Sequence, residues 1–185
     1  LKRLNFWYNA SMEGFLSPEE ILNELDLKDN MTAVEFGCGA GAFALALAKQ
    51  LKQGRVYGLD VQEEKISALK NKTLLEKLKN VFAIHCDLES EGGSTLHKNS
   101  ADIVLIPNVL FQAENKYAII KESERILKQG GQLLIIDWQK SSLLAPNQGT
   151  ISSDEIKKIT ESAELVFKKE FSAGEHHFAL LFNKI

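Results

Sequence analysis

The stretch that decides the fold is Thr32-Ala33-Val34-Glu35-Phe36-Gly37-Cys38-Gly39-Ala40-Gly41. Residues 33–36 are mostly apolar, which predicts a buried strand. Three glycines follow, and an alanine-rich stretch begins behind them. Glycine tolerates positive φ and lets a ligand approach the backbone, while the first turn of a helix offers unpaired N–H groups. The stretch therefore predicts a strand, a tight loop and a helix that form a cofactor site at the carboxyl edge of a parallel sheet.

Two classes of cofactor are bound by loops of this kind. Gly37, Gly39 and Ala42 fit the dinucleotide pattern G-x-G-x-x-G/A, whereas Gly37, Gly39 and Gly41 fit the G-x-G-x-G of S-adenosylmethionine (SAM) methyltransferases. Glu35 favours the second class, because a carboxylate repels a diphosphate and attracts the ammonium group of a methionine moiety. The structural alternative is that Glu35 bonds a loop amide, since a buried glutamate needs a partner.

Further acids follow the next two predicted strands, 55–60 and 81–86. Asp60 lies about 20 residues beyond the glycine loop, where an acid binds ribose hydroxyls, and both SAM and NAD contain that ribose. Its alternative role is to cap a helix. Asp87 follows the third strand, where an aspartate by itself is more often a turn former. Acids after three successive strands are a more specific signal than a glycine motif alone.

Residues 34–41 resemble the first motif of class I SAM-dependent methyltransferases, and the likeness extends from about Ser17 to the C-terminus. The chain is most similar to the small stand-alone branch that includes ubiquinone/menaquinone-type methyltransferases. The resemblance implies SAM as cofactor, S-adenosylhomocysteine as product, and an adenine contact from Asp87 and its neighbours. The residues that it implies for the cofactor site are Glu35, Gly37, Cys38, Gly39, Gly41, Asp60, Val61, Cys86, Asp87, Leu88 and Asn108.

The expected fold is α/β, with a Rossmann-like, doubly wound, mostly parallel seven-stranded sheet and an antiparallel C-terminal hairpin. Such a hairpin is typical of the methyltransferase fold and not of dinucleotide domains. We expect an N-terminal arm over 1–16 and a single domain over 17–185. The remaining strands are predicted over 101–106, 132–137, 165–171 and 177–183. Helices are predicted from Ser17 onward and over 41–53, 62–79, 114–128 and 152–163.

The predicted helices carry signals for their ends and their buried faces. Ser17 is the expected N-cap of the first helix, with Glu20 completing a capping box. Gly54 and Gly130-Gly131 are expected to end the helices that precede them. The helix over 62–79 is expected to turn five apolar residues inward: Ile66, Leu69, Leu74, Leu75 and Leu78.

Composition excludes several classes of function. The 185 residues are 44% hydrophobic and 25% charged, as in an ordinary globular domain. The net charge of −3 provides no basic field for nucleic acid, and no apolar run is long enough to cross a membrane. No signal peptide is visible. Cys38 and Cys86 are expected to be reduced thiols in a cytoplasmic protein, and the spacing of the histidines and cysteines predicts no metal site.

The substrate side carries fewer signals. Asp137 and Trp138 end a predicted strand at the cofactor edge and, with Tyr8 of the N-terminal arm, are the substrate-pocket candidates. Three residues are candidates for a general base, namely Asp137, His176 and His177, and none of them is assigned this role. The two histidines are expected to lie at the surface or in cross-strand pairs of the hairpin. The sequence Pro107-Asn108-Val109-Leu110 departs from the Asn/Asp-Pro-Pro-aromatic motif of methyltransferases that act on adenine, cytosine or glutamine.

The sequence therefore predicts an enzyme of EC 2.1.1 type that transfers a methyl group from SAM to a small-molecule acceptor. Two alternatives stay open. One is an NAD(P)-binding oxidoreductase, motivated by the dinucleotide pattern. The other is a SAM-binding protein without catalysis, since no base stands out. The sequence indicates neither the acceptor nor an oligomeric state.

Overall fold

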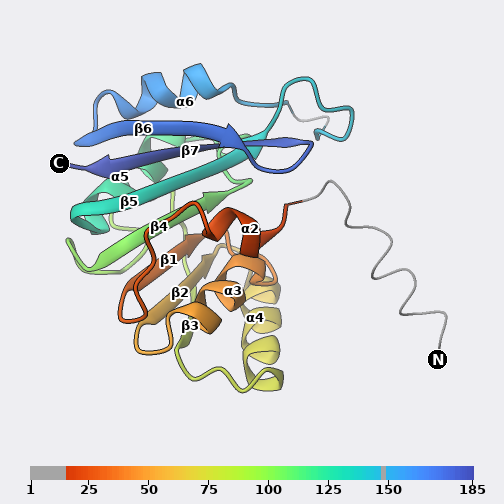
Figure 1. Cartoon of the computed structure of the whole chain (residues 1–185), viewed down its shortest axis with the longest axis vertical. Helices are drawn as coiled ribbons and strands as arrows, with labels where there is room; N and C mark the ends of the chain where they lie inside the picture. The colour runs from red at the N-terminus through yellow and green to blue at the C-terminus, as the bar shows by residue number, and fades with distance from the viewer. Residues whose placement is uncertain (1–15, 147–148) are drawn as a thin grey trace.

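Seven strands form one mixed sheet in the computed structural model, which describes residues 16–146 and 149–185 (Figure 1). The strand order is β3-β2-β1-β4-β5-β7-β6. Neighbouring strands from β3 to β5 are parallel, while β7 is antiparallel to both β5 and β6. The predicted sheet and terminal hairpin are confirmed. The strands are β1 (Thr32–Phe36), β2 (Arg55–Asp60), β3 (Val81–His85), β4 (Ala101–Pro107), β5 (Leu127–Trp138), β6 (Leu165–Ser172) and β7 (His177–Lys184).

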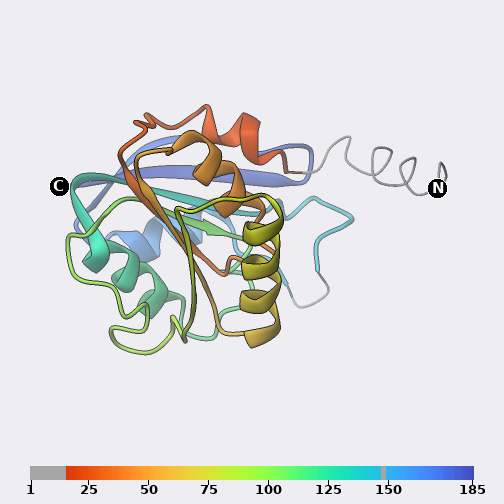
Figure 2. The same ribbon diagram turned by 90° about the horizontal axis from the view of Figure 1, so that it is seen from below.

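Helices cover both faces of this sheet (Figure 2). One face packs against α2 (Pro18–Leu22), α3 (Ala42–Gln50) and α4 (Glu63–Leu75). The other packs against α5 (Lys116–Ile126) and α6 (Ser153–Thr160). None of the described helices is long and apolar enough to span a membrane. The predicted arm over 1–16 lies almost entirely outside the described residues and stays a prediction, as does the extent of the domain over 17–185.

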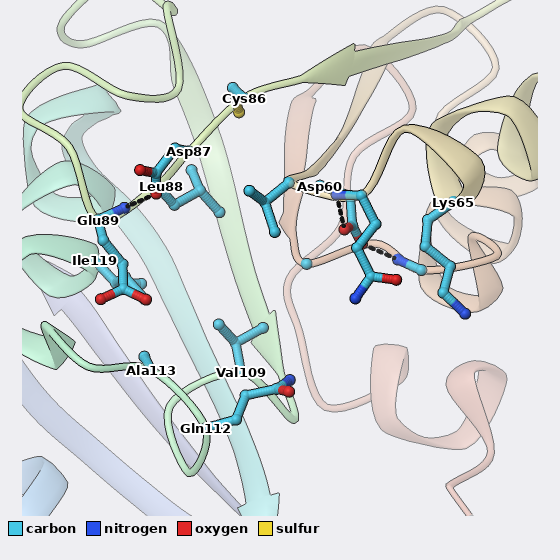
Figure 3. Close-up of a pocket in the computed structure, with 14 residues that line it drawn as sticks. Asp60, Lys65, Cys86, Asp87, Leu88, Glu89, Val109, Gln112, Ala113 and Ile119 are labelled. Carbon is cyan, nitrogen blue, oxygen red and sulfur yellow. Dashed lines mark hydrogen bonds between the residues drawn. The ribbon is translucent and has the colours of Figure 1, made fainter.

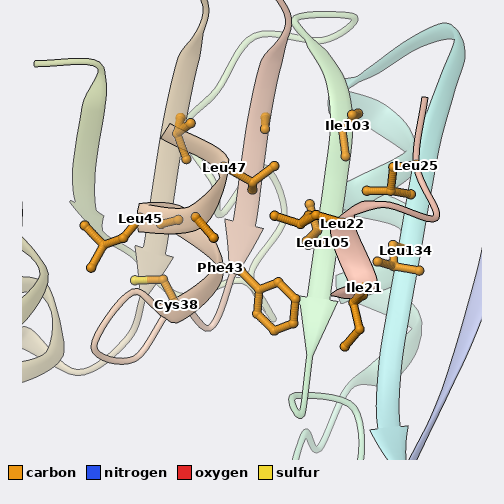
Figure 4. Close-up of a cluster of buried hydrophobic side chains, with 14 of the residues drawn as sticks. Ile21, Leu22, Leu25, Cys38, Phe43, Leu45, Leu47, Ile103, Leu105 and Leu134 are labelled. Carbon is orange, nitrogen blue, oxygen red and sulfur yellow. The ribbon is translucent and has the colours of Figure 1, made fainter. Parts of the chain in front are cut away.

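The core consists of two apolar layers separated by the sheet. Side chains of a strand point alternately to its two faces, so Ile103 and Leu105 of β4 belong to the layer under α3, and Val104 and Ile106 to the layer under α5. Figure 4 shows Phe43 of α3 in the first layer, beside Leu105. Because both faces are buried, the central strands are nearly continuous apolar runs, as parallel strands require.

The predicted inward face of α4 is wrong in part. Leu74 and Leu75 are 75% and 81% exposed. The buried residues of α4 are Ile66, Leu69 and Thr73, spaced three and four apart along one helical stripe. The two leucines lie beyond that stripe, where apolar composition alone does not bring a residue against the sheet.

The predicted role of Gly130-Gly131 as a helix stop is also wrong. Helix α5 ends at Ile126 and the chain enters β5 directly at Leu127, so both glycines lie within the strand. Gly130 has φ +75, and the pairing of β4 with β5 shifts between Ala101 and Ile103. The glycines accommodate an irregular first half of β5 beside this register shift.

The predicted helices all form, with shorter limits than expected. Helix α3 ends at Gln50, before Gly54, with Leu51 as its C-cap. The Ser17 hydroxyl caps α2 by accepting from the Glu20 amide at 3.4 Å. The complete capping box occurs instead at α6, between Ser152 and Glu155. Helix ends depend on tertiary contacts more than the interiors do, so limits of this kind are the least determined by local sequence.

Candidate cofactor-binding site

The glycine loop between β1 and α3 has the conformation that only glycine adopts freely. Gly37, Gly39 and Gly41 have φ of +66, +51 and +83, and Gly41 is the N-cap of α3. A Cβ on Gly37 would overlap Cγ2 of Val109, whereas a Cβ on Gly39 would meet no atom within 4 Å. Gly37 therefore allows close packing of the loop after β4, and Gly39 leaves backbone open to a ligand.

Asp60 at the end of β2 holds this loop. One carboxylate oxygen accepts from the Gly39 amide at 2.8 Å, and the other accepts from the Gln62 amide at 2.9 Å. The helix-capping alternative is not borne out, because the N-cap of α4 is Gln62 and not Asp60. Each carboxylate oxygen has a second lone pair, so the two bonds leave capacity for the ribose hydroxyls that the spacing of Asp60 from the glycine loop predicts.

Glu35 is buried beneath the loop, 2% exposed, and its Oε2 accepts from the Ala44 amide at 2.8 Å. Burial, more than the neighbouring Asp60 carboxylate, raises the pKa of Glu35 to about 8. The structural alternative for Glu35 is right in that its carboxyl group has an amide partner, but this amide belongs to the first turn of α3 and not to the loop. This helix N-terminus is where a dinucleotide domain receives a diphosphate, and here a side chain of the protein occupies it.

A pocket of about 340 Å³ lies at the carboxyl edge of the sheet, between the ends of β1, β2 and β3 and the loop after β4 (Figure 3). Its volume is in the range of small-molecule sites. Seven of the residues that the sequence implies line it: Gly37, Gly39, Asp60, Val61, Cys86, Asp87 and Leu88. The structure therefore brings together residues that are separated by more than 50 positions in the chain.

Four implied residues are absent from the described lining of this pocket. Glu35 is buried beneath the loop, Cys38 is a buried residue of the loop, and Gly41 is the N-cap of α3. Asn108 follows β4 with φ +56 and accepts from Gln112 Nε2 through its backbone carbonyl at 3.0 Å. These residues shape the loops around the pocket, and a direct cofactor contact from them stays a prediction.

Sequence reasoning missed seven lining residues, namely Gln62, Lys65, Glu89, Val109, Gln112, Ala113 and Ile119. Lys65 lies three residues after Gln62, on the first turn of the helix that follows Asp60, so helical spacing could have indicated it. Val109 and Ala113 come from the loop after β4, and Ile119 comes from α5. No local pattern links these residues to the glycine loop.

Asp87 and Glu89 close the side of the pocket next to α5. The Asp87 carboxylate accepts from the Glu89 amide at 2.9 Å and from Ser90 Oγ at 3.0 Å, as the turn-forming alternative predicts. The Glu89 carboxylate accepts from the amides of Glu114 and Asn115 at the start of α5. The loop after β3 is thereby tied to an element 25 residues further along the chain.

The charges of the pocket favour a cationic ligand. Three carboxylates line it, from Asp60, Asp87 and Glu89, and Lys65 is the one cation among the described lining residues (Figure 3). A group of like charges disfavours a ligand of the same sign and attracts one of the opposite sign. SAM carries a sulfonium and an ammonium group, whereas the linking group of NAD is a doubly charged diphosphate, so the pocket fits SAM.

The two cysteines are free thiols, as predicted. Burial raises the pKa of Cys38 and, to about 11, that of Cys86. Both thiols stay protonated at neutral pH and are therefore weak nucleophiles.

The substrate-pocket candidates Asp137 and Trp138 lie at the end of β5, next to β4 at the carboxyl edge of the sheet. Asp137 is fully buried, and its carboxylate accepts from the amides of Phe111 at 3.1 Å and Trp138 at 2.8 Å. Burial raises the pKa of Asp137 to about 6. The Trp138 ring lies 4.1 Å from the ring of His177, centroid to centroid. Asp137 and Trp138 are not among the described lining residues, and Tyr8 lies outside the described part of the chain.

The two histidines of the hairpin have different environments. His177 is 1% exposed, so the surface expectation is wrong for it and the cross-strand expectation is right, since it pairs with Trp138. Burial lowers the pKa of His177 to about 4. His176 is half-buried, and its Nδ1 lies 3.2 Å from Ser142 Oγ.

Known proteins resemble the chain in sequence. A family model described as a methyltransferase domain matches residues 27–176. The demethylmenaquinone methyltransferase of Bacillus cereus (strain ATCC 10987 / NRS 248) is 28% identical over 134 residues, which are 72% of this chain and 55% of that protein. The chain thus spans about half the length of the curated relatives it matches.

Solved structures resemble the chain in fold. A SAM-dependent methyltransferase from Aquifex aeolicus superposes with a TM-score of 0.85 and 26% identity, covering 100% of this chain and 98% of that one. The cyclase SpnF superposes with a TM-score of 0.78 at 14% identity, over 90% and 80% of the two chains, and that likeness shows the fold alone. Because the family model matches well over half of the chain, the chain belongs to the methyltransferase domain family.

Proposed function

We propose that the chain binds SAM in the pocket at the glycine loop and transfers its methyl group to a small-molecule acceptor. The observation that carries the proposal is the contact between Glu35 and the Ala44 amide. It places a carboxyl group at the helix N-terminus that a diphosphate would need. The acidic lining of the pocket points the same way, because SAM is a cation and NAD is an anion.

The residues of the pocket have separate roles in this proposal. The Asp60 carboxylate binds the ribose hydroxyls while it holds the Gly39 amide. Asp87 and Leu88 contact the adenine, as the family resemblance implies. The open backbone at Gly39 lies against the methionine part of the cofactor. When bound, SAM supplies an electrophilic sulfonium methyl group.

Methyl transfer needs positioning above all. The methyl carbon leaves a neutral thioether as it bonds to the nucleophile, so holding the two atoms about 3–3.5 Å apart supplies much of the rate. A base is needed only where the acceptor must lose a proton. The buried Asp137 carboxylate already accepts hydrogen bonds from two backbone amides. This arrangement suits a residue that supports the backbone on the acceptor side better than one that removes a proton from the acceptor.

In this proposal the methyl acceptor is a small molecule. Curated relatives are named for demethylmenaquinone, a small molecule, and the net charge of −3 offers no general attraction for nucleic acid.

The free thiols of Cys38 and Cys86 support a cytoplasmic location.

Calorimetry with SAM, S-adenosylhomocysteine and NAD tests the cofactor. We expect both SAM and S-adenosylhomocysteine to bind and NAD not to bind. Tight binding of NAD alone would overturn the proposal in favour of an oxidoreductase.

A second assay separates methyl transfer from binding without catalysis. The chain is incubated with SAM and a panel of phenols, amines, thiols and quinols, and release of S-adenosylhomocysteine is measured. Release that depends on one class of acceptor supports the enzyme. Binding of SAM with no release across the panel favours a SAM-binding protein without catalysis.

A further inference from the structure

The amino edge of the sheet, opposite the cofactor pocket, carries a groove that is lined by lysines. The groove has a volume of about 430 Å³ and lies between the C-terminal end of α3 and the turn that joins α4 to β3. Four of its lining residues are lysines: Lys49, Lys52, Lys77 and Lys79. We refer to it as the lysine groove. The whole chain has a net charge of −3, so the groove is a local excess of positive charge.

Hydrogen bonds hold the two walls of the lysine groove together. The side-chain amide of Asn80 donates to two carbonyls at the C-terminal end of α3, at 3.0 and 2.8 Å. Of the four lysines, only Lys49 has an acidic partner within residues 16–146 and 149–185, which is the Glu76 carboxylate at 2.8 Å. The other three ammonium groups can therefore pair with an anion from outside the described chain.

Two exposed leucines lie next to the lysine groove, on the last turn of α4. Leu74 and Leu75 are 75% and 81% exposed, and they immediately precede Glu76, the partner of Lys49. Two more exposed lysines lie on the preceding turn: Lys70 and Lys72. Helix α4 lies over the edge strand β3, at the end of its layer of helices (Figure 1). Apolar and cationic side chains therefore share one outward surface.

We propose that this surface docks the protein onto a membrane that contains anionic lipids. The lysine groove binds the phosphate groups of the lipids, and Leu74 and Leu75 enter the boundary between headgroups and acyl chains. Helices that lie on membranes combine cations and apolar side chains in this way, and lysines are attracted to an anionic lipid surface. The attachment goes beyond the proposed methyl transfer, because it needs neither SAM nor an acceptor.

The exposed leucines favour a membrane over a nucleic acid as the partner. A cluster of lysines alone fits the phosphates of either partner. A bilayer also offers an apolar environment in which Leu74 and Leu75 lose their contact with water. The backbone of a nucleic acid offers no such environment, so the leucines would gain nothing from it.

A second role for the lysines is to stabilise the ends of helices. Lysines near the C-terminal ends of α3 and α4 interact favourably with the helix dipoles. This role accounts for the charges, but it does not account for the two exposed leucines. It also predicts that removing the lysines lowers the thermal midpoint and has no effect on membrane binding, so the two roles can be separated.

Docking through the end of α4 leaves the cofactor pocket open. Lys65 lies on the first turn of α4 and lines that pocket, whereas Leu75 is the last residue of the helix. The rise of a helix separates the two residues by about 15 Å along its axis. The cofactor pocket and the docking surface therefore face opposite ends of the same helix.

Sedimentation with lipid vesicles tests the role of the charges. Binding is measured, without SAM, to vesicles of phosphatidylcholine alone and to vesicles of equal parts phosphatidylcholine and phosphatidylglycerol. We expect the wild type to bind the anionic vesicles at least about 100-fold more tightly, since each lysine near such a surface contributes about 5-fold. Lys77→Glu/Lys79→Glu is expected to weaken this binding at least about 25-fold, with a thermal midpoint close to that of the wild type.

Lys158→Glu/Lys168→Glu is the matched control for the charges. It makes the same change in net charge with two exposed lysines of α6 and β6, at the other end of the sheet. This variant is expected to bind anionic vesicles like the wild type, because salt screens charges that lie far from the membrane.

A second pair of variants tests the leucines. Leu74→Ser/Leu75→Ser keeps every charge and is expected to weaken binding to anionic vesicles at least about 10-fold, because the apolar contact with the membrane is lost. Leu143→Ser/Leu144→Ser is the matched control, since these two leucines are 99% and 52% exposed on another segment. It is expected to bind as the wild type does.

The inference is overturned if the wild type does not prefer anionic vesicles, or if a control variant loses as much binding as its test variant. Loss of binding in Lys2→Glu/Arg3→Glu, with full binding in Lys77→Glu/Lys79→Glu, would assign the contact to the N-terminal residues instead. A DNA duplex that binds as tightly as the anionic vesicles, with or without the leucines, would replace the membrane by a nucleic acid. A failure to bind SAM overturns only the proposed function, because the vesicle assay contains none.

Discussion

Two halves of the sheet edge are held together differently: the ends of β1, β2 and β3, proposed for the cofactor (the cofactor half), and the ends of β4, β5 and β7, proposed for the acceptor (the acceptor half). In the cofactor half, three carboxylates accept from amides at most nine residues away: Asp60 from Gln62, Asp87 from Glu89, and Glu35 from Ala44. Two longer contacts add to these, from the Gly39 amide to Asp60 and from the Asn115 amide to Glu89. In the acceptor half, Asp137 accepts from the adjacent Trp138 but also from Phe111, 26 residues away, and Gln139 donates to His177, 38 residues away.

This difference explains why one half can be recognised in the sequence and the other cannot. A short-range contact needs residue types at a fixed spacing, which a motif records. A long-range contact depends on which strands become neighbours, and β7 joins β5 only through the strand order of the whole sheet. The cofactor half can therefore be recognised as a sequence motif, whereas the acceptor half is formed by residues that only the order of the strands brings together.

The largest expected effect concerns Glu35, at the centre of the cofactor half. Its pKa is raised to about 8 from 4.5, so between these pH values the folded protein holds more protons than the unfolded chain. The free energy of unfolding then falls as the pH rises from 4.5 to 8, by about 4 kcal/mol. Glu35→Gln keeps an acceptor for the Ala44 amide and cannot ionise. Urea unfolding at pH 5, 6.5 and 8 is expected to show this fall in the wild type and not in the variant.

Glu64→Gln is the control for that series, because Glu64 is exposed on α4. It is expected to follow the wild type at every pH. An equal fall in the wild type and in Glu35→Gln would show that the carboxyl group of Glu35 is not the source.

The next effect tests the junction between the two halves. Gly37→Ala places a Cβ at φ +66 against Cγ2 of Val109, a side chain of the loop after β4. The backbone strain and the overlap together are expected to cost about 3 kcal/mol in the free energy of unfolding. Gly130→Ala is the matched control, since its φ is +75 and its Cβ meets no atom within 4 Å. Its cost is expected to be about 1–2 kcal/mol, from the backbone alone.

A double variant separates the cost of the overlap at Gly37 from the cost of the backbone strain. Val109→Ala removes the opposing methyl groups, so Gly37→Ala is expected to cost less in that background, and chemical denaturation measures the difference. Equal costs in the two backgrounds would show that the halves do not touch here.

A smaller effect is expected on cofactor affinity. Asp60→Ala removes the acceptor for the Gly39 amide and the proposed ribose contact. SAM binding is expected to weaken by at least ~1.5 kcal/mol, measured by calorimetry. Asp102→Ala is the control, because Asp102 accepts from the Thr32 amide and from Lys128 at the other edge of the sheet. The ribose role is wrong if both variants bind SAM alike.

The smallest effect is expected on the outer face of α4. Leu75→Lys changes a side chain that is 81% exposed, so the free energy of unfolding is expected to stay within about 0.5 kcal/mol of the wild type. Leu69→Ala on the buried stripe of the same helix is expected to cost about 3 kcal/mol. A large cost for Leu75→Lys would mean that this face is covered by something beyond the described chain.

The sequence alone determined the glycine loop and the strand ends of the cofactor half. The apolar run 33–36, the glycines behind it and the acids after two further strands act through local geometry, since a strand end, a positive φ and a carboxylate two residues before an amide are fixed by neighbours in the chain. For the same reason the alternation of apolar residues gave the sheet and the hairpin correctly. The helical stripe of α4 could have been read more sharply, because Leu74 and Leu75 do not continue the spacing of Ile66, Leu69 and Thr73.

Only the tertiary structure decided the rest. It brought Val109 and Ile119 into the pocket, and it buried His177 beside Trp138 with no hydrogen-bond partner for its ring among residues 16–146 and 149–185. Each of these facts depends on burial or on which strands are neighbours, and the burial of a residue cannot be inferred from its type alone. The free energy of a polar atom is set by what surrounds it after folding, which is why the acceptor side became visible only in three dimensions.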